Sequence, residues 1–409
     1  MKKIGVVVEY NPFHNGHLYQ INEIKKKFGN DILLVIVISG DFVQRGEISY
    51  LDKWEKTKIA LNYGIDLVIE LPLYYSIQNA EVFSKMSVKI LDYMEMDIQV
   101  FGAENEEIEK LYEIVALQEK KEYKESFFSK MKNGNSYSNS QRLVLEEYGC
   151  KEIVKSNNIL GIEYIRTIKN EKLKIEPCII KREVSEYIEN EIGENREKIA
   201  SASFLRNKLN FEENSEKNKE KVLTNIKRFL PKEVYEIIYN KEIINNKKKS
   251  NLKSIKDRLY EIIKYKILTN SKKKIMEIYD MTEEIYVRIH VGLLNSKNHK
   301  QFLERVKSRN FSIKRIERLM LNVLLDIEKK SVDYNIDYVR ILGFNEKGQK
   351  YLKKLKLKDK KNIFVNWKDI EKQIESKKLK IEKNGFLIKQ MFFEENEKLN
   401  PIIMNKQEG

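Results

Sequence analysis

Over roughly the first 180 residues, continuously apolar segments of strand length alternate with segments in which apolar residues recur at helical spacing. The apolar segments are 4–10, 31–40, 65–72, 97–104 and 173–182. The helical segments are 18–28, 52–64, 80–94 and about 157–169. Strands that are apolar at every position are buried on both faces, as in a parallel sheet with right-handed helical crossovers. The pattern predicts an α/β fold, with an N-terminal Rossmann-like parallel sheet covered by helices on both faces.

The alternation stops near residue 210, and the following segment is basic, rich in lysine and helical in its spacing. Its clearest helix covers 311–327, where Ser312 can cap the first turn. Strand patterns return at 337–344 and 361–367. The sequence therefore predicts three parts. They are the α/β domain over 1–210, a basic and mainly helical region over 211–330, and a small mixed α/β unit over 331–409.

The formal net charge is +15, from 77 Lys and Arg against 62 Asp and Glu. Such an excess favours a polyanionic partner, most commonly nucleic acid, although the bias of an AT-rich genome toward lysine gives the same balance. Two cysteines build neither a disulfide framework nor a zinc site by themselves. Because the chain opens without a signal peptide and has no stretch near the ~20 apolar residues of a membrane helix, we expect a cytoplasmic protein.

Two of the four histidines, His14 and His17, lie three residues apart in EYNPFHNGH, directly after the first predicted strand. Ligands of open parallel sheets bind beyond the carboxyl ends of the strands, where a following helix directs its free N–H groups and positive dipole end. Gly16 lets the backbone approach a ligand closely. The arrangement suits a triphosphate, because phosphate transfer depends on positioning and charge stabilisation. A metal pair lacks a third ligand in the sequence, and a structural role is the other alternative.

The segment HNGH after a first strand resembles the HxGH nucleotidyltransferase superfamily, which has a second motif at the start of a late helix. Here IASASFLRNKL, residues 199–209, matches that motif with Ser201, Ser203 and Arg206. The resemblance implies that serine hydroxyls and helix N–H groups hold the β and γ phosphates while Arg206 neutralises charge. It makes His14, His17 and Arg206 the candidate catalytic residues. Alone, 199–209 would be a capped amphipathic helix.

Further segments, in order along the chain, are similar to the tRNA(Met) cytidine acetate ligase family. They are 5–17, 38–47, 52–54, 66–72, 101–104, 157–165 and 337–348. The family implies that acetate and ATP form acetyl-adenylate and pyrophosphate, after which the acetyl group passes to the wobble cytidine of elongator tRNA(Met), giving N4-acetylcytidine. Acetate is a poor acyl donor, and its coupling to AMP provides a good leaving group. The basic region would hold the phosphates of the anticodon loop while its bases are splayed out.

The resemblance also implies ATP contacts along the first strand and its turn, at two later strand ends, in one helix and in the second motif. These are Val7, Val8, Glu9, Tyr10, Asn11, Pro12, Phe13, His14, Asn15, Gly16, His17, Leu18, Tyr19, Gln20, Gly102, Asn157, Arg182, Ser201 and Ser203. Gly102 would let adenine or ribose lie against the backbone. The chain departs from the family at Gln20, where a histidine is expected, and at 183–190, which lacks an expected glycine and histidine.

The basic region contains candidate residues for contacts with tRNA phosphates, although each could instead be an ordinary solvent-exposed side chain. They are Lys247, Lys248, Lys249, Lys272, Lys273, Lys274, Arg309, Lys314, Arg315 and Arg318. After the second strand, Asp41 is a candidate ligand for Mg²⁺ on the triphosphate, and Arg45 for acetate or a tRNA phosphate. An ion pair between Asp41 and Arg45 is the alternative.

The expected partners are ATP, acetate and the anticodon loop of elongator tRNA(Met), with no membrane and no stable protein partner. Two other functions stay open. One is a small-molecule nucleotidyltransferase that makes a nucleotide cofactor, and the other is a non-catalytic tRNA-binding protein.

Overall fold

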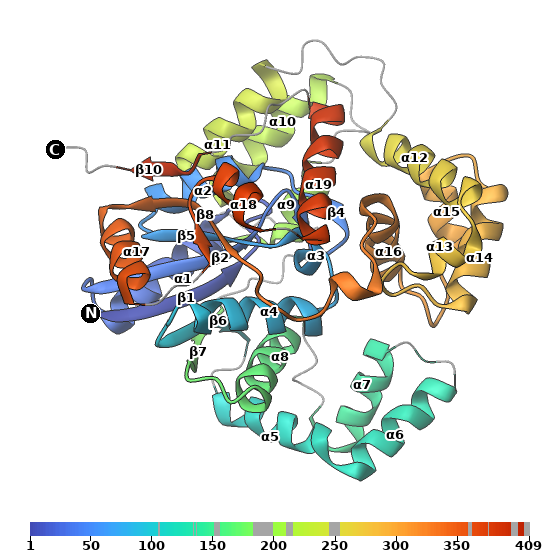
Figure 1. Ribbon diagram of the computed structural model, residues 1–409, viewed down its shortest axis with the longest axis horizontal. Coiled ribbons are helices and arrows are strands. Elements are labelled where there is room, and N and C mark those ends of the chain that lie inside the picture. Colours follow the sequence, from blue (N-terminus) through green and yellow to red (C-terminus); the bar gives the residue numbers. More distant parts are fainter. Residues whose placement is uncertain are drawn as a thin grey trace.

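The computed structural model describes residues 1–104, 107–133, 135, 137–150, 156–182, 199–209, 216–244, 254–358, 362–374, 376–393 and 400–404. At its centre is an eight-stranded sheet in the order β10-β8-β5-β2-β1-β6-β7, with β9 beside β8 (Figure 1). The strands are β1 (Lys2–Val8), β2 (Ile32–Ser39), β5 (Leu67–Leu71), β6 (Ile98–Ala103), β7 (Glu176–Lys181), β8 (Val339–Asn345), β9 (Ile363–Phe364) and β10 (Ile402–Met404). A separate hairpin joins β3 (Phe42–Val43) to β4 (Glu47–Ile48).

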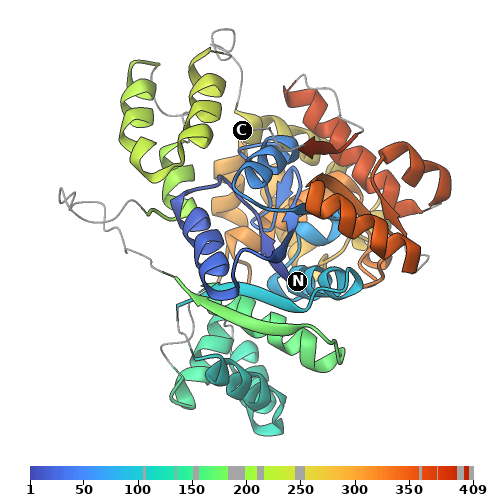
Figure 2. The ribbon, with the colours of Figure 1, turned by 90° about the vertical axis from the view of Figure 1, so that its left-hand side faces the viewer.

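The first strand lies between β2 and β6 and is parallel to both. From β1 the chain passes to β2 and β5 on one side, and later to β6 and β7 on the other. Figure 2 shows β6 and β7 side by side at their edge of the sheet. The predicted α/β fold with a mainly parallel sheet is confirmed, and its topological switch point lies at the carboxyl end of β1. Open α/β sheets bind their ligands at such points.

Helices cover both faces of the sheet, as predicted. On β2 the even-numbered apolar residues, such as Leu34 and Ile36, pack in one core, and the odd-numbered ones, such as Val35 and Val37, pack in the other. The first core includes α1 (Asn15–Phe28), α2 (Lys53–Asn62), α9 (Ala202–Lys208), α10 (Glu216–Ile226), η3 (Lys227–Phe229) and α11 (Lys232–Tyr239). The second includes α3 (Leu73–Ser76), α4 (Ala80–Tyr93), α5 (Ile108–Glu119), α6 (Lys121–Lys132), α7 (Tyr137–Glu147) and α8 (Ser156–Asn170).

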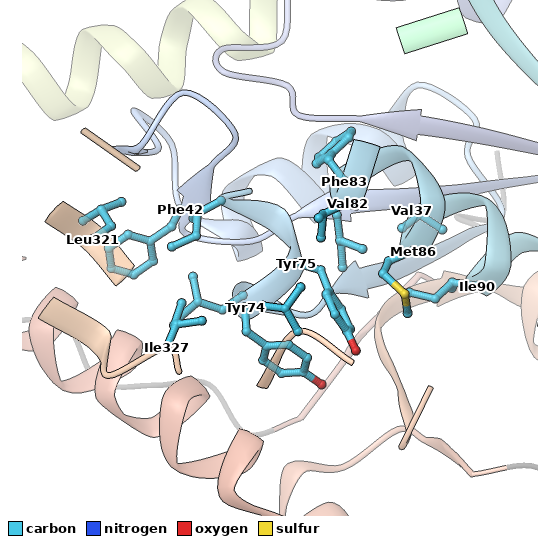
Figure 3. Packing of buried hydrophobic residues seen from close by; sticks show 14 of the residues in the cluster. Val37, Phe42, Tyr74, Tyr75, Val82, Phe83, Met86, Ile90, Leu321 and Ile327 are labelled. Carbon is cyan, nitrogen blue, oxygen red and sulfur yellow. The ribbon is translucent and has the colours of Figure 1, made fainter. Parts of the chain in front are cut away.

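The described part of the segment predicted to be helical consists mainly of helices joined by short connections. After η4 (Asn240–Ile244) it contains α12 (Ile255–Thr269), α13 (Lys272–Met276), α14 (Glu283–Leu294), α15 (His299–Val306), α16 (Ile313–Leu325) and η6 (Lys329–Ser331). Ser312 caps α16 as predicted, accepting the Arg315 N–H. Figure 3 shows Leu321 of α16 and the following Ile327 beside Phe42 and Tyr74, so this region packs directly on the sheet domain. No helix among the described residues is long and apolar enough to span a membrane.

The C-terminal segment contributes to the central sheet. Its helices are α17 (Glu346–Lys358), α18 (Trp367–Gln373) and α19 (Lys377–Phe393). The sequence predicts a small mixed unit over 331–409, but β8 runs antiparallel to β5, and β9 and β10 pair with β8. A buried ion pair between Arg340 of β8 and Glu70 of β5, at 3.1 Å, accompanies this pairing. The strands of this segment therefore extend the first domain's sheet, and the three boundaries remain predictions.

Candidate active site

A cavity of about 300 Å³ lies beyond the carboxyl ends of β1, β6 and β7. It brings together the two motifs that the sequence places almost 200 residues apart, because His14, Gly16 and His17 face Ser203 and Arg206 across it. Its lining consists of Val7, Val8, Glu9, Tyr10, Asn11, His14, Gly16, His17, Tyr19, Gln20, Gln44, Arg45, Phe83, Phe101, Gly102, Leu160, Tyr164, Ile180, Lys181, Arg182, Ile199, Ala200, Ser201, Ala202, Ser203 and Arg206.

His14 and His17 form a reciprocal cap at the N-terminus of α1. Nδ1 of His14 accepts the N–H of Gly16 at 3.0 Å, and Nδ1 of His17 accepts the N–H of His14 at 3.2 Å. The rings stack with their centroids 3.8 Å apart. Because both Nδ1 atoms accept backbone hydrogen bonds, each neutral imidazole carries its proton on Nε2. Each ring therefore keeps one N–H donor for a ligand oxygen.

Burial keeps both imidazoles uncharged at neutral pH. It lowers the pKa of His14 to about 3, and the charges of Arg182 and Arg206 act in the same direction. The pKa of His17 also lies well below its ordinary value, because of burial and then the proximity of His14 and Arg182. The histidines thus act as neutral hydrogen-bond donors, and the positive charge of the cavity comes from Lys181, its guanidinium groups and the α1 N-terminus.

Two glycines in the cavity wall are required by close contacts. A Cβ on Gly16 would lie 2.8 Å from Cε1 of His14, so the folded-back imidazole leaves room only for glycine. A Cβ on Gly102 would lie 2.9 Å from Cγ of Arg182. Gly102 lines the cavity and also makes room for the aliphatic part of Arg182, and its contact with the nucleotide stays a prediction. That arginine therefore enters the cavity across the end of β6.

The second motif positions Arg206 against the first. Ser201 caps α9 by accepting the N–H of Phe204, and Arg206 lies one turn further on. Its guanidinium donates to the backbone oxygen of Asn11 at 2.7 Å and to Oγ of Ser203 at 3.1 Å. Nε of Arg206 also lies 3.9 Å from a carboxylate oxygen of Glu47. The guanidinium is thus held at the end of β1 by neutral acceptors and one carboxylate.

Among the predicted ATP contacts whose side chains the structure describes, most line the cavity, but four do not. These are Pro12, Phe13, Asn15 and Leu18. Phe13 stacks on Tyr63 in the core, and Asn15 donates to the backbone oxygen of Arg228. Phe13 and Asn15 therefore hold the turn between β1 and α1 by contacts on the side away from the cavity.

Some predictions fall on parts of the chain that the structure does not describe. Residues 183–190 and Lys247, Lys248 and Lys249 lie outside the described residues, as does the side chain of Asn157 in the first turn of α8. Its neighbour Asn158 is buried and accepts the N–H of Glu104.

Asp41 lies outside the cavity, in a buried ion-pair cluster. Burial opposes its ionisation, but the positive charges of Lys53 and Lys389 outweigh that effect and lower the pKa of Asp41. Its carboxylate accepts the N–H of Lys53 at 3.0 Å and lies 3.2 Å from Nζ of Lys389. Within the described residues, no group of three His, Cys, Asp or Glu side chains is placed to hold a metal ion. The prediction of Asp41 as a Mg²⁺ ligand therefore has no support in this geometry, and its ion-pair partners are lysines rather than Arg45.

An aromatic and aliphatic wall of the cavity was not predicted. It is built by Phe83 of α4, Phe101 of β6, and Leu160 and Tyr164 of α8. The rings of Phe101 and Tyr164 lie 5.5 Å apart. In the sequence these residues have the spacing of ordinary core positions, so only the packing of α4 and α8 against β6 shows that they face the cavity. Gln44 and Arg45, in the turn of the β3–β4 hairpin, face the same space.

Several predicted phosphate-binding cations have protein partners. Arg315 donates to both carboxylate oxygens of Asp280, at 2.9 and 2.7 Å. Lys314 pairs with Glu47 and Glu317, and Lys272 with Glu283. Lys273 and Arg309 are exposed and form no ion pair with another described residue.

A helix capped by paired histidines at the switch point of a parallel sheet, facing an arginine from a late helix, defines a nucleotidyltransferase-type site. Residues 1–400 match the family model described as HIGH Nucleotidyl Transferase. The chain belongs to this family and, within it, to the tRNA(Met) cytidine acetate ligase family.

Relatives of the second, narrower family match over most of their length. The tRNA(Met) cytidine acetate ligase of Fusobacterium nucleatum subsp. nucleatum is 36% identical over 356 residues, covering 86% of this chain and 85% of that protein. The ligase of Bacillus subtilis is 32% identical over 367 residues, covering 87% and 85%. The crystal structure of Thermotoga maritima TmcAL bound with alpha-thio ATP has a TM-score of 0.80 and 29% identity, covering 99% of this chain and 100% of that one. These matches confirm the resemblance seen in the sequence motifs.

Proposed function

We propose that this chain is an ATP-dependent tRNA-modifying ligase that joins acetate to the wobble cytidine of elongator tRNA(Met), forming N4-acetylcytidine. The observation that carries the proposal is the meeting of His14, His17 and Arg206 around one cavity at the switch point of the sheet. The tRNA(Met) cytidine acetate ligases that match the chain, and the alpha-thio ATP bound to Thermotoga maritima TmcAL, support the substrates. A tRNA substrate also fits a protein of the cytoplasm.

In the first step, a carboxylate oxygen of acetate attacks the α-phosphorus of ATP. The bond from that phosphorus to the bridging oxygen of the β-phosphate breaks, and pyrophosphate leaves. Negative charge grows on the phosphate oxygens, where the Nε2–H donors of His14 and His17 and the guanidinium groups of Arg182 and Arg206 stabilise it.

In the second step, N4 of the cytidine attacks the acetyl carbon of acetyl-adenylate directly, and AMP leaves. An acyl-enzyme intermediate needs a nucleophile beside the nucleotide. Both cysteines, Cys150 and Cys178, lie outside the cavity lining. Direct transfer from the adenylate is therefore the simplest route.

The test is to incubate the protein with isotopically labelled acetate, ATP and bulk tRNA, and to measure the mass of the tRNA nucleosides. The proposal predicts labelled N4-acetylcytidine that depends on ATP. A nucleotidyltransferase for a small molecule would leave the tRNA unlabelled, and a non-catalytic binding protein would bind tRNA without consuming ATP. Either result would overturn the proposal.

A further inference from the structure

One acidic side chain in the cavity is unsuited to contacts with ATP phosphates. Glu9 follows β1 directly and lines the cavity. One carboxylate oxygen, Oε1, accepts the backbone N–H of Gln44 at 2.7 Å, and the described residues give the other oxygen no hydrogen-bond partner. A carboxylate repels phosphate oxygens, so this acceptor suits a substrate that presents N–H groups.

A donor without a partner belongs to the same wall. Nε2 of Gln44 is buried and has no hydrogen-bond partner among the described residues. A buried amide without a partner is costly, and such groups in a cavity are commonly completed by a ligand. The backbone N–H of Gln44 donates to the Glu9 carboxylate, so the two residues are neighbours in the cavity lining. The lining therefore combines one carboxylate acceptor with one side-chain amide that lacks a partner among the described residues.

The backbone of Glu9 is held in place by a buried lysine, Lys56. Nζ of Lys56 donates to the backbone oxygens of Glu9, Ser39 and Gly40, at 3.1, 2.7 and 2.7 Å. The ends of β1 and β2 are thereby held together beneath the carboxylate. On the cavity side, Tyr164 and Phe101 provide aromatic surface against which a flat base can pack.

Cytosine presents the complementary pattern. Its N4 amine is a donor, its N3 and O2 are acceptors, and a carboxylate is the side chain that accepts from cytosine N4. Uracil has an oxygen in place of the amine, which would face the carboxylate as a second acceptor. The pair of Glu9 and Gln44 thus fits cytosine, the pyrimidine whose N4 amine receives the acetyl group.

We propose that Glu9 and Gln44 bind the acceptor cytosine, with Glu9 accepting an N4–H and Gln44 donating to N3 or O2, and that Glu9 takes the N4 proton during acetyl transfer. This inference rests on the proposed function. It moves the carboxylate of Glu9 from the predicted ATP contacts to the acceptor.

The proton transfer balances the second step. The N4 lone pair forms a bond to the acetyl carbon, and the bond from that carbon to the phosphate oxygen of AMP breaks. N4 loses one proton to the Glu9 carboxylate, and AMP leaves as a phosphate monoester without needing that proton. Burial raises the pKa of Glu9 above its ordinary value, which makes the carboxylate a better base than an exposed one.

The decisive variant is Glu9→Gln, which keeps the shape and the acceptor for the Gln44 N–H but cannot take a proton. Two reactions report separately on it: acetate-dependent exchange of labelled pyrophosphate into ATP, and acetyl transfer to tRNA. We expect exchange to stay within about threefold of wild type and transfer to fall at least about 100-fold. Hydroxylamine, which captures acetyl-adenylate without Glu9, should give acetyl hydroxamate at a rate close to that of wild type.

Two further variants make the test specific. Gln44→Met keeps the length of the side chain but removes its whole amide group, donor and acceptor, and should weaken transfer to tRNA while leaving exchange intact. Glu23→Gln, on α1 and outside the cavity lining, should change neither reaction.

Equal losses of exchange and transfer in Glu9→Gln would place Glu9 in adenylate formation and overturn the inference. Transfer at the wild-type rate in that variant would overturn it as well. Absence of acetate-dependent exchange in the wild-type protein would overturn the proposed function itself, which distinguishes the two failures.

Discussion

Gly46 lies so close to the backbone of Arg318 that a Cβ on residue 46 would come within 2.5 Å of the Arg318 nitrogen. This contact seats the β3–β4 hairpin on α16. The next residue, Glu47, pairs with Lys314 of α16 and lies 3.9 Å from Nε of Arg206 in the cavity. The hairpin therefore joins the nucleotide cavity on one side to the helical region on the other, and its turn carries Gln44 and Arg45.

We predict that Gly46→Ala displaces this hairpin. Gly46 has φ of +77°, where an L side chain is strained by about 1–2 kcal/mol, and the added Cβ would also collide with backbone that cannot yield. The loss of stability, measured by urea unfolding, should exceed that of Gly149→Ala. Gly149 has φ of +76° but nothing within 4 Å of its position for a Cβ, so it isolates the backbone strain. Equal losses in the two variants would contradict the proposed close packing.

Lys56 should be essential for stability. Its Nζ is fully buried and donates to three backbone oxygens at the ends of β1 and β2. In Lys56→Met these carbonyl oxygens would lose a charged donor, and we expect a loss of about 2–4 kcal/mol. The exposed Lys58 on the same helix gives the matched control, because Lys58→Met should alter stability by less than about 0.5 kcal/mol. Similar urea midpoints for the two variants would refute this role.

The buried histidines should make the protein acid-sensitive. The folded-state pKa of His14 is about 3 and that of His299 about 4, both below the ordinary 6.5, and that of His17 is lowered as well. The unfolded chain therefore binds more protons than the folded chain as the pH falls below about 6.5, so stability falls with it. We expect the contribution of these histidines to the free energy of unfolding to decrease between about pH 6.5 and 4.5. Replacing His14 and His17 by Asn should flatten this slope, and an unchanged slope would argue against neutral buried imidazoles.

The histidine pair should matter for the chemical step. His14→Ala removes an Nε2–H donor and the cap of Gly16, and we expect adenylate formation to fall about 10²- to 10³-fold. The control is His290→Ala, on α14 and outside the cavity lining. The readout is the rate of pyrophosphate release in a single turnover. A loss no larger than that of the control would exclude a direct role for His14.

Local sequence patterns predicted the elements well where burial is periodic. The segment 52–64 corresponds to α2 at Lys53–Asn62, and 80–94 to α4 at Ala80–Tyr93. The HNGH turn was also predictable, since its position after a buried strand already indicates the sheet edge that binds ligands. The reciprocal histidine cap was not expected, because Ser, Thr, Asp and Asn are the usual residues at that position.

Long-range pairings were not predictable from local patterns. Nothing in the spacing of 337–344 shows that β8 joins β5, because that choice depends on Arg340 meeting Glu70 across 270 residues of sequence. Likewise, the sequence predicts Asp41 as a ligand for Mg²⁺, but its carboxylate forms an ion pair with Lys389 of α19. The aromatic wall of the cavity also depends on long-range packing. The spacing of Phe83 and Tyr164 in the sequence is that of core residues, and only the packing of their helices places them in the cavity wall.

The most direct test of the central claim is acetate-dependent exchange of labelled pyrophosphate into ATP, with and without bulk tRNA. If the cavity forms acetyl-adenylate, exchange requires acetate and is lost in His14→Ala. Exchange that proceeds equally without acetate, or no exchange in either condition by a protein that still binds ATP, would contradict the ligase mechanism.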